Sequence, residues 1–251
     1  MKRREFFLIG SLLSSGAAIF PSELFSYPVT KNRLRVGFIG TGLRGQVMMD
    51  LTTHREDVDI PAICDIDDGM IKNALNVLKK AGYPEPKVYN KGDEDFRNMV
   101  KNEDLDGVFI ATPWEWHHPM AIAAMKAGKH VGTEVPAALT VADCWDLVNT
   151  SEKTGRFCMI MENVCYRRDV MAVLNMVRKG FFGELLHCQG GYQHDLRKVK
   201  FNDGIKPYGG GVEFGAKGYS EAKWRTNHSV NRNGDLYPTH GLGPVSTMLD
   251  I

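Results

Sequence analysis

A glycine-rich turn between an apolar run and a helical pattern constrains this chain more than any other feature. The turn, Gly40-Thr41-Gly42-Leu43-Arg44-Gly45, follows the apolar run Val36–Ile39 and precedes residues 46–53, which have helical spacing. A second apolar run, residues 62–64, ends in Asp65. This order predicts a dinucleotide-binding site, because such sites consist of a strand, a glycine turn, a helix, a second strand and an acidic residue.

Each position of this pattern has a physical purpose. Gly40 permits the tight turn, Gly42 lets the backbone approach a pyrophosphate, and Gly45 lets the helix pack closely on the strand. The helix N-terminus supplies unpaired N–H groups and the positive end of a dipole. Asp65 is expected to accept hydrogen bonds from ribose hydroxyls and to repel a 2′-phosphate, which favours NAD over NADP. The alternative is a purely structural turn.

From Arg33 onward, runs of strand length alternate with helical patterns, which predicts an α/β fold with a parallel sheet covered on both faces. We expect further strands at 88–89, 107–111, 130–133 and 156–161, and helices at 70–81, 93–101, 119–127 and 141–153. A helix at 169–179, a strand at 184–192, a glycine-rich stretch and an apolar run within 236–251 follow. We therefore predict a Rossmann dinucleotide-binding domain over residues 33–165 and an incomplete second domain over 166–251.

The N-terminal segment is predicted to be a targeting signal. Arg3 and Arg4 precede an apolar stretch, residues 6–20, which is too short for an ordinary membrane span. This arrangement resembles a twin-arginine export signal, so residues 1–32 are expected to be signal and linker, and the protein periplasmic or extracellular. A basic N-terminus in front of a buried helix is the alternative.

Net charge and the spacing of possible ligands bear on two kinds of partner, nucleic acids and metal ions. A formal net charge of +1 gives no support for a nucleic-acid partner. His117 and His118 are adjacent, but no third ligand has a useful spacing, so no metal site is expected. The five cysteines are odd in number and most fall within apolar runs, which predicts buried free thiols. A homo-oligomer stays possible.

Four blocks add specificity: Glu134–Ala138, Met161–Tyr166, Gly190–Asp195 and Tyr237–Gly241. Together with the glycine turn and Ala111-Thr112-Pro113, they make the chain resemble the glucose–fructose oxidoreductase, inositol dehydrogenase and MocA family. Within that family the chain resembles glycoside hydrolase family 109. The resemblance implies that the second domain is an α+β domain whose open sheet faces the nicotinamide. Because that sheet is completed by later sequence in the family, we expect the chain to be part of a longer protein or an inactive truncation.

The resemblance implies a NAD-dependent α-N-acetylgalactosaminidase acting on glycans with terminal N-acetylgalactosamine. Its route takes a hydride from carbon 3, removes the proton on carbon 2, expels the leaving group from carbon 1, adds water and returns the hydride. Val135 stands where many dehydrogenases of the family have a lysine that assists proton transfer, which counts against a plain dehydrogenase. A sugar or inositol dehydrogenase, and an exported sugar-binding protein with a vestigial cofactor site, are the alternatives.

The resemblance also carries over individual residues. Tyr192 and His240 are the candidate acid and base, with His194 in reserve, and imidazole changes charge near neutral pH. The remaining substrate contacts are expected from Arg225, Tyr237, Pro238 and Thr239, with Tyr192 and His240 also touching the sugar. The cofactor is expected to contact Leu43, Arg44, Asp65, Trp114, Glu115, Trp116, His117, Glu134, Val135 and Asn163. Trp114 and Trp116 have an alternative as core aromatics.

Overall fold

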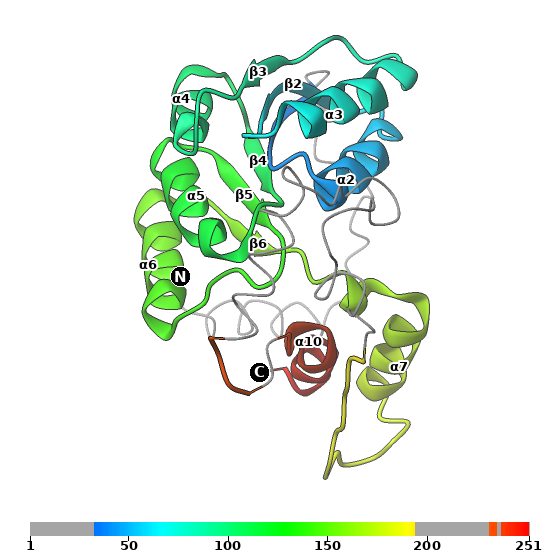
Figure 1. The fold of residues 1–251 in the computed structure, drawn as a ribbon. Helices are drawn as coiled ribbons and strands as arrows, with labels where there is room; N and C mark the ends of the chain where they lie inside the picture. The colour runs from blue at the N-terminus through cyan, green and yellow to red at the C-terminus, as the bar shows by residue number, and fades with distance from the viewer. Residues whose placement is uncertain (1–32, 194–230, 235–236, 251) are drawn as a thin grey trace, which may run out of the picture. The chain divides into compact units, whose positions relative to one another are not determined.

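A computed structural model describes residues 33–193, 231–234 and 237–250 of the chain. Six parallel strands form one sheet in the order β3-β2-β1-β4-β5-β6 (Figure 1). The strands are β1 (Leu34–Ile39), β2 (Val58–Cys64), β3 (Lys87–Tyr89), β4 (Gly107–Ile110), β5 (His130–Thr133) and β6 (Cys158–Ile160). The strand order reverses between β1 and β4, so the crevice beyond their carboxyl ends is the place where such sheets bind ligands.

Helices cover both faces of this sheet, as predicted. They are α2 (Leu43–Thr53), α3 (Asp68–Lys80), α4 (Asp95–Asn102), α5 (Trp114–Lys126) and α6 (Val141–Thr154). One core cluster joins α2 and α3 to β1 and β2 around Phe38 and Ile63. The other joins α4, α5 and α6 to the sheet around Phe96, Ile110 and Met125. The predicted α/β class with a Rossmann-type sheet is therefore confirmed.

The chain continues past the sheet with the short 3-10 helix η2 (Asn163–Tyr166) and helix α7 (Arg168–Arg178). Helix α10 (Thr239–Leu249) follows the stretch that the structure does not describe. Leu34–Ile251 group into one compact unit, apart from Met1–Arg33. The predicted export signal lies outside the described residues. Within the described part, no helix has the length and apolarity needed to cross a membrane.

The glycine turn after β1 is as tight as the pattern predicts. Gly40 has a φ of 89°, and its N–H donates to the carbonyl of Cys64 at 2.8 Å. A Cβ on Gly40 would lie 2.7 Å from the backbone of Ala111 at the end of β4. A Cβ on Gly45 would lie 2.0 Å from the carbonyl oxygen of Gly40. Neither position has room for a side chain, so the turn holds α2 against the ends of β1 and β4.

Helix α5 begins five residues before the predicted start at Pro119. Pro113 caps the helix, and the N–H of Trp116 donates to its carbonyl at 2.9 Å. Pro119 lies inside the helix, where its ring removes the one hydrogen bond that an N–H would donate to Glu115. The residues expected to form a loop after β4 are therefore the first turn of α5, and their side chains point in different directions.

The predicted strand at 184–192 is wrong. Residues 184–193 have no regular secondary structure, and no strand among the described residues pairs with them. An extended run becomes a strand only when a neighbour satisfies its backbone hydrogen bonds. The sequence of this segment alone therefore could not decide whether it forms a strand.

The expectation of buried thiols holds for one cysteine only. All five cysteines are free, and Cys64 is buried, Cys144 is exposed and the other three are half-buried. Burial and the nearby carboxylates raise the pKa of Cys64 to about 12, so this thiol is unreactive near neutral pH. The apolar runs predicted burial wrongly because Cys144 lies on the outer face of α6.

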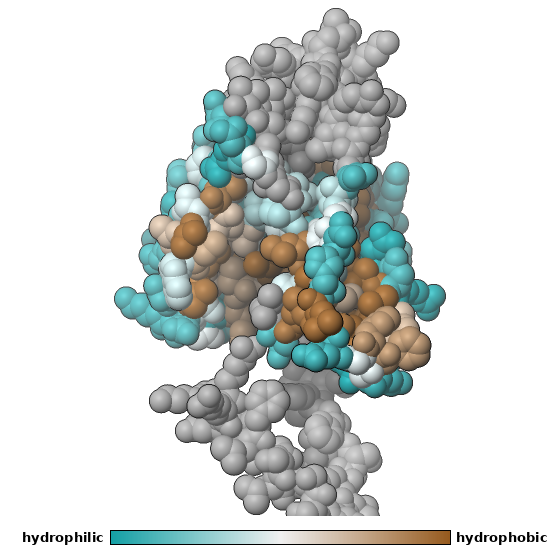
Figure 2. Space-filling model, turned by 90° about the horizontal axis from the view of Figure 1, so that it is seen from below, coloured by the Kyte–Doolittle hydropathy of each residue, from teal (hydrophilic) through white to brown (hydrophobic). Residues whose placement is uncertain are grey.

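Large apolar side chains are exposed in several places, including Val141, Trp145, Phe157, Phe181 and Leu186. In Figure 2 hydrophobic residues gather in patches that hydrophilic residues flank.

The turn yields a first prediction. Gly45→Ala should lower the free energy of unfolding by about 1–3 kcal/mol, because its methyl group meets the backbone of Gly40 rather than a movable side chain. Urea unfolding followed by circular dichroism measures the change. Gly191→Ala is the control, since a Cβ there meets nothing within 4 Å. Equal stability of the two variants would contradict the tight packing at Gly45.

Candidate active site

The start of α2 is built to accept an anion. Gly42 is the N-cap residue and offers no side-chain cap, and the first turn of α2 contains no acidic residue. Helix α3 differs, because Asp67 caps it by accepting from the N–H groups of Gly69 and Met70 at 2.7 and 3.1 Å. Leu43 and Arg44 are thus the first residues of a helix whose first turn has no acidic side chain to neutralise the positive end of the helix dipole. These residues fit the pyrophosphate of a dinucleotide.

Asp65, at the end of β2, is held in a fixed orientation beside this turn. Its Oδ2 accepts from the N–H and the Oγ1 hydroxyl of Thr41 at 2.6 and 3.0 Å. Its Oδ1 accepts from the N–H of Asp67 at 2.9 Å. Each carboxylate oxygen can accept further hydrogen bonds. The carboxylate therefore fits the ribose hydroxyls that the sequence pattern assigns to it.

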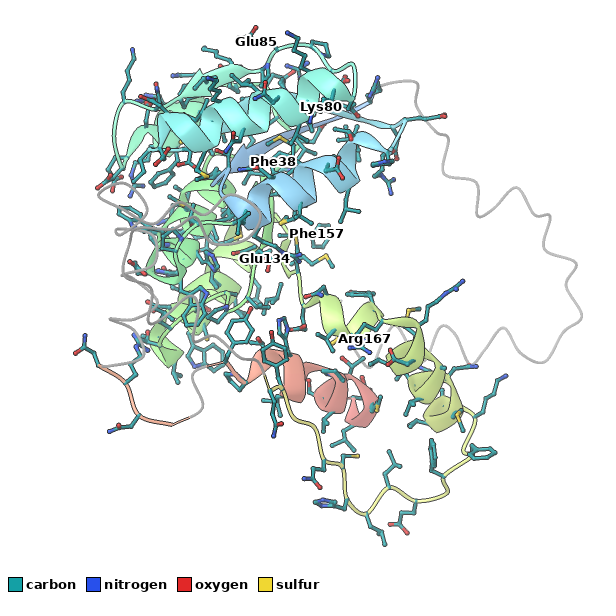
Figure 3. All side chains as sticks on the ribbon, turned by 45° about the vertical axis from the view of Figure 1, so that its right-hand side comes forward. Phe38, Lys80, Glu85, Glu134, Phe157 and Arg167 are labelled. Carbon is teal, nitrogen blue, oxygen red and sulfur yellow. The ribbon has the colours of Figure 1, made fainter. Side chains whose placement is uncertain are left out.

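An ion pair joins two residues predicted to contact the cofactor. Arg44 Nε lies 2.5 Å from Glu134 Oε1, which connects the first turn of α2 to the end of β5. The N–H of Glu134 donates to the carbonyl of Ile110 at 2.9 Å, so its backbone is fixed to β4. Figure 3 shows Glu134 close to α2. This pair bridges the carboxyl edge of the sheet, where the strand order reverses.

The first turn of α5 contains four predicted cofactor residues with different surroundings. Glu115 is exposed, and Trp116 is half-buried and packs edge-on against Phe96 of the core, at a ring centroid distance of 6.2 Å. His117 is only 1% exposed. Trp114 is buried and stacks on Tyr237. Trp116 therefore matches the alternative of a core aromatic, whereas Trp114 contacts the segment that precedes α10.

His117 connects two loops beneath the site. Its Nδ1 lies 2.7 Å from the carbonyl of Pro136, and its Nε2 lies 2.8 Å from the carbonyl of Thr112. Burial lowers the pKa of His117, although both carbonyls and nearby carboxylates act in the opposite direction. A neutral imidazole has one N–H, so it donates to one of these carbonyls at a time.

A second group of residues surrounds His240 in the first turn of α10. His240 Nδ1 lies 2.6 and 2.8 Å from the two carboxylate oxygens of Glu162, and both side chains are about nine-tenths buried. Tyr192 and Tyr237 meet the imidazole edge-on, with ring centroids 4.7 and 4.8 Å away. The two tyrosine rings lie 5.6 Å apart. The predicted acid and base candidates, Tyr192 and His240, are thus in contact.

The structure places the remaining predicted residues as follows. Val135 is buried, and Asn163 begins η2 directly after Glu162. Pro238 precedes α10 and is exposed. The hydroxyl of Thr239 is buried and has no hydrogen-bond partner among the described residues. Arg225 and His194 lie outside the described residues.

Glu162 is a site residue that the sequence prediction did not include. Its Oε1 also accepts from the N–H of Val164 at 2.9 Å, so the carboxylate is fixed from two sides. The signal was its position, because Glu162 follows closely after β6 at the carboxyl edge of the sheet. When Glu162 is ionised it holds the proton of His240 on Nδ1, which leaves Nε2 for proton transfer.

Comparison with known families agrees with this geometry. The family model described as an oxidoreductase family with an NAD-binding Rossmann fold matches residues 34–162. The chain belongs to this oxidoreductase family. A second model, the C-terminal domain of glycosyl hydrolase 109, matches residues 166–251. The first match identifies residues 34–162 as a Rossmann domain of the NAD-binding type.

Curated relatives are similar over most or all of the chain. A "Glycosyl hydrolase family 109 protein" from Stenotrophomonas maltophilia (strain K279a) is 52% identical over 261 residues, covering 100% of this chain and 56% of the relative. An "Alpha-N-acetylgalactosaminidase" from Tannerella forsythia is 57% identical over 222 residues, covering 87% of this chain and 47% of the relative. The chain spans about half the length of these relatives. The resemblance to glycoside hydrolase family 109 is confirmed.

Solved structures with a similar fold are also found. A scyllo-inositol dehydrogenase from Lactobacillus casei with bound NAD(H) and scyllo-inositol is 21% identical, with a TM-score of 0.54. The match covers 61% of this chain and 43% of that chain. At this identity the likeness supports the fold and nothing finer.

The buried histidine gives a second prediction. In the unfolded chain His117 takes up a proton as the pH falls through its ordinary pKa of 6.5, whereas the folded protein resists this because burial lowers the pKa. The stability contributed by neutral His117 is therefore complete above pH 6.5 and is lost as the pH falls through the lowered pKa. Urea unfolding of His117→Gln should show a smaller loss of stability below pH 6.5 than the unchanged protein shows.

The adjacent histidine supplies the matched control. His118 is partly exposed and pairs with Asp146 at 2.9 Å. His118→Gln should retain the loss of stability on the acid side that His117→Gln removes. If His117→Gln keeps the full acid-side loss, another group is responsible for it.

Proposed function

We propose that this protein is a NAD-dependent glycosidase that hydrolyses terminal α-linked N-acetylgalactosamine. The observation that carries the proposal is the contact of His240 with Glu162 and two tyrosines, in a chain whose other half fits a dinucleotide. The name of the Tannerella forsythia relative supports the sugar. Export through the twin-arginine-type segment at residues 1–32 is part of the proposal.

The nucleotide would be held by the turn and the strand ends already described. Leu43 and Arg44 would bind the pyrophosphate, and Asp65 would bind the adenosine ribose and select NAD over NADP. Glu134 would orient Arg44, since the two side chains are already paired. When bound, NAD would supply a reversible hydride acceptor for carbon 3 of the sugar, so that no net oxidation occurs.

Proton transfer would fall to His240 and Tyr192. The carboxyl group of Glu162 lies against Nδ1 of the imidazole, so His240 would exchange protons with the sugar through Nε2. Tyr192 is partly exposed and lies against the same imidazole, where its hydroxyl can serve the second proton transfer. The proposed route first removes a proton from carbon 2 and later returns one. Tyr192 and His240, which lie in contact, would provide the base and the acid for these two steps.

A dehydrogenase with net turnover of NAD is the second candidate. The family fold favours it, but Val135 is buried and has no group to transfer a proton. An exported sugar-binding protein with a vestigial cofactor site is the third candidate. The acid-free start of α2 and the oriented carboxylate of Asp65 argue against a vestigial site, because a lost function would not require them.

One assay separates these candidates. The full-length protein is incubated with p-nitrophenyl α-N-acetylgalactosaminide, with and without added NAD, while p-nitrophenol and NADH absorbance are recorded. We expect p-nitrophenol release without lasting NADH. Accumulating NADH without p-nitrophenol would establish a dehydrogenase, and no signal in either channel, with the sugar bound, would favour a binding protein.

The role of Glu162 gives a further prediction. Glu162→Gln should lower kcat by about 10²-fold, within the range that acid–base groups contribute, with a smaller change in KM. The physical reason is that an amide no longer fixes the proton of His240 on Nδ1. The pH profile of kcat should change shape in this variant. Glu152→Gln, at an exposed position on α6, is the control; equal kcat in the two variants would exclude Glu162 from the site.

A further inference from the structure

Trp114 occupies a position that connects the two halves of the chain. It is the first residue of α5 and follows the capping residue Pro113, four positions after Ile110 at the end of β4. Its side chain is 7% exposed, and its indole stacks on Tyr237 with a centroid distance of 5.4 Å and an interplanar angle of 27°. Trp116, two residues later, packs on the core instead. Trp114 is therefore the aromatic residue of this turn that contacts the segment before α10.

Tyr237 in turn contacts His240, one of the two acid–base candidates. Its ring meets His240 edge-on at 4.8 Å and an angle of 77°, and lies 5.6 Å from Tyr192. Four rings, those of Trp114, Tyr237, Tyr192 and His240, thus form one continuous aromatic cluster. The cluster begins at the end of β4 and ends at the imidazole.

His240 is consequently held from two strand ends. Glu162 follows β6 and fixes Nδ1, while Trp114 follows β4 and supports the ring of Tyr237 that packs on the imidazole. The carboxylate of Glu162 fixes the position of Nδ1 and the direction of the hydrogen bond between Nδ1 and the carboxylate. The tyrosine ring limits rotation of the imidazole about that bond, because edge-on aromatic contacts have a preferred geometry.

We propose that Trp114 is a positioning residue for the sugar site, which acts through Tyr237 and couples cofactor occupancy to sugar binding. This inference rests on the proposed function. Trp114 lies at the strand end that borders the nucleotide crevice, so a cofactor that fixes the indole also fixes Tyr237 and His240. Each ligand then raises the affinity of the other by the same factor, as linkage requires.

The test uses the full-length protein and measures N-acetylgalactosamine binding by calorimetry, with and without NAD. Trp114→Leu removes the stack and should weaken sugar binding in the NAD-loaded protein about tenfold, with a smaller effect on NAD affinity. Trp114→Phe retains an aromatic face and should restore most of the affinity. The factor by which NAD strengthens sugar binding should fall towards one in Trp114→Leu.

A double-mutant cycle shows whether Tyr237 carries the effect. Tyr237→Leu should reproduce the loss, and the double variant Trp114→Leu/Tyr237→Leu should be little worse than either alone, since contacting residues are not additive. Trp145→Leu, at an exposed tryptophan on α6, is the matched control and should bind the sugar normally. Thermal unfolding of every variant verifies that it is folded, and Trp114→Phe keeps the test valid if the leucine variant is not.

The outcomes separate this inference from the proposed function. If the unchanged protein neither binds nor hydrolyses the sugar, the proposed function fails, and the inference fails with it. If the unchanged protein binds and hydrolyses the sugar, but Trp114→Leu weakens NAD binding without weakening sugar binding, then Trp114 only borders the cofactor and the inference is overturned. Additive losses in the double variant would also overturn the inference, because Trp114 would then act independently of Tyr237.

Discussion

The close contact between the turn at Gly40 and the end of β4 is the constraint on which the site depends. A Cβ on Gly40 would lie 2.7 Å from the backbone of Ala111, and a Cβ on Gly45 would lie 2.0 Å from the carbonyl of Gly40. Because these backbones touch, the start of α2 is held at the carboxyl ends of β1 and β4. Arg44 can then pair with Glu134, and the N–H and hydroxyl of Thr41 can reach Asp65. A larger residue in this turn would separate all of these groups.

The features that the sequence predicts correctly are those whose determining contacts are local. The β1 strand, the glycine turn and the acid at the end of β2 follow one another closely, and each has a recognisable residue type. Helix α3 has Asp67 at its start and apolar residues at helical spacing, and it forms close to the predicted range. These features are fixed by backbone geometry and by the periodicity of burial, which residue types reveal directly.

The contacts that sequence reasoning missed join residues far apart in the chain. Glu162 and His240 are 78 residues apart, and Arg44 and Glu134 are 90 apart. The position of Glu162 shortly after β6 can be read from the sequence, but its partner depends on where α10 packs. The false strand at 184–192 and the predicted start of α5, which was placed five residues too late, have different causes. A strand needs a neighbour, and a proline at a helix start and a proline in its second turn have the same local appearance.

One helical turn serves both sides of the site. Trp114 and His117 are three residues apart in α5, yet their side chains meet different parts of the molecule. His117 is held between the carbonyls of Thr112 and Pro136, beneath the strand ends. Trp114 faces Tyr237 and, through it, the imidazole of His240. The anchoring of His117 thus fixes the first turn of α5, and the same turn holds the indole of Trp114 against the ring of Tyr237. The first turn of α5 therefore contacts both the loop that follows β4, beside the nucleotide crevice, and the aromatic cluster that contains His240.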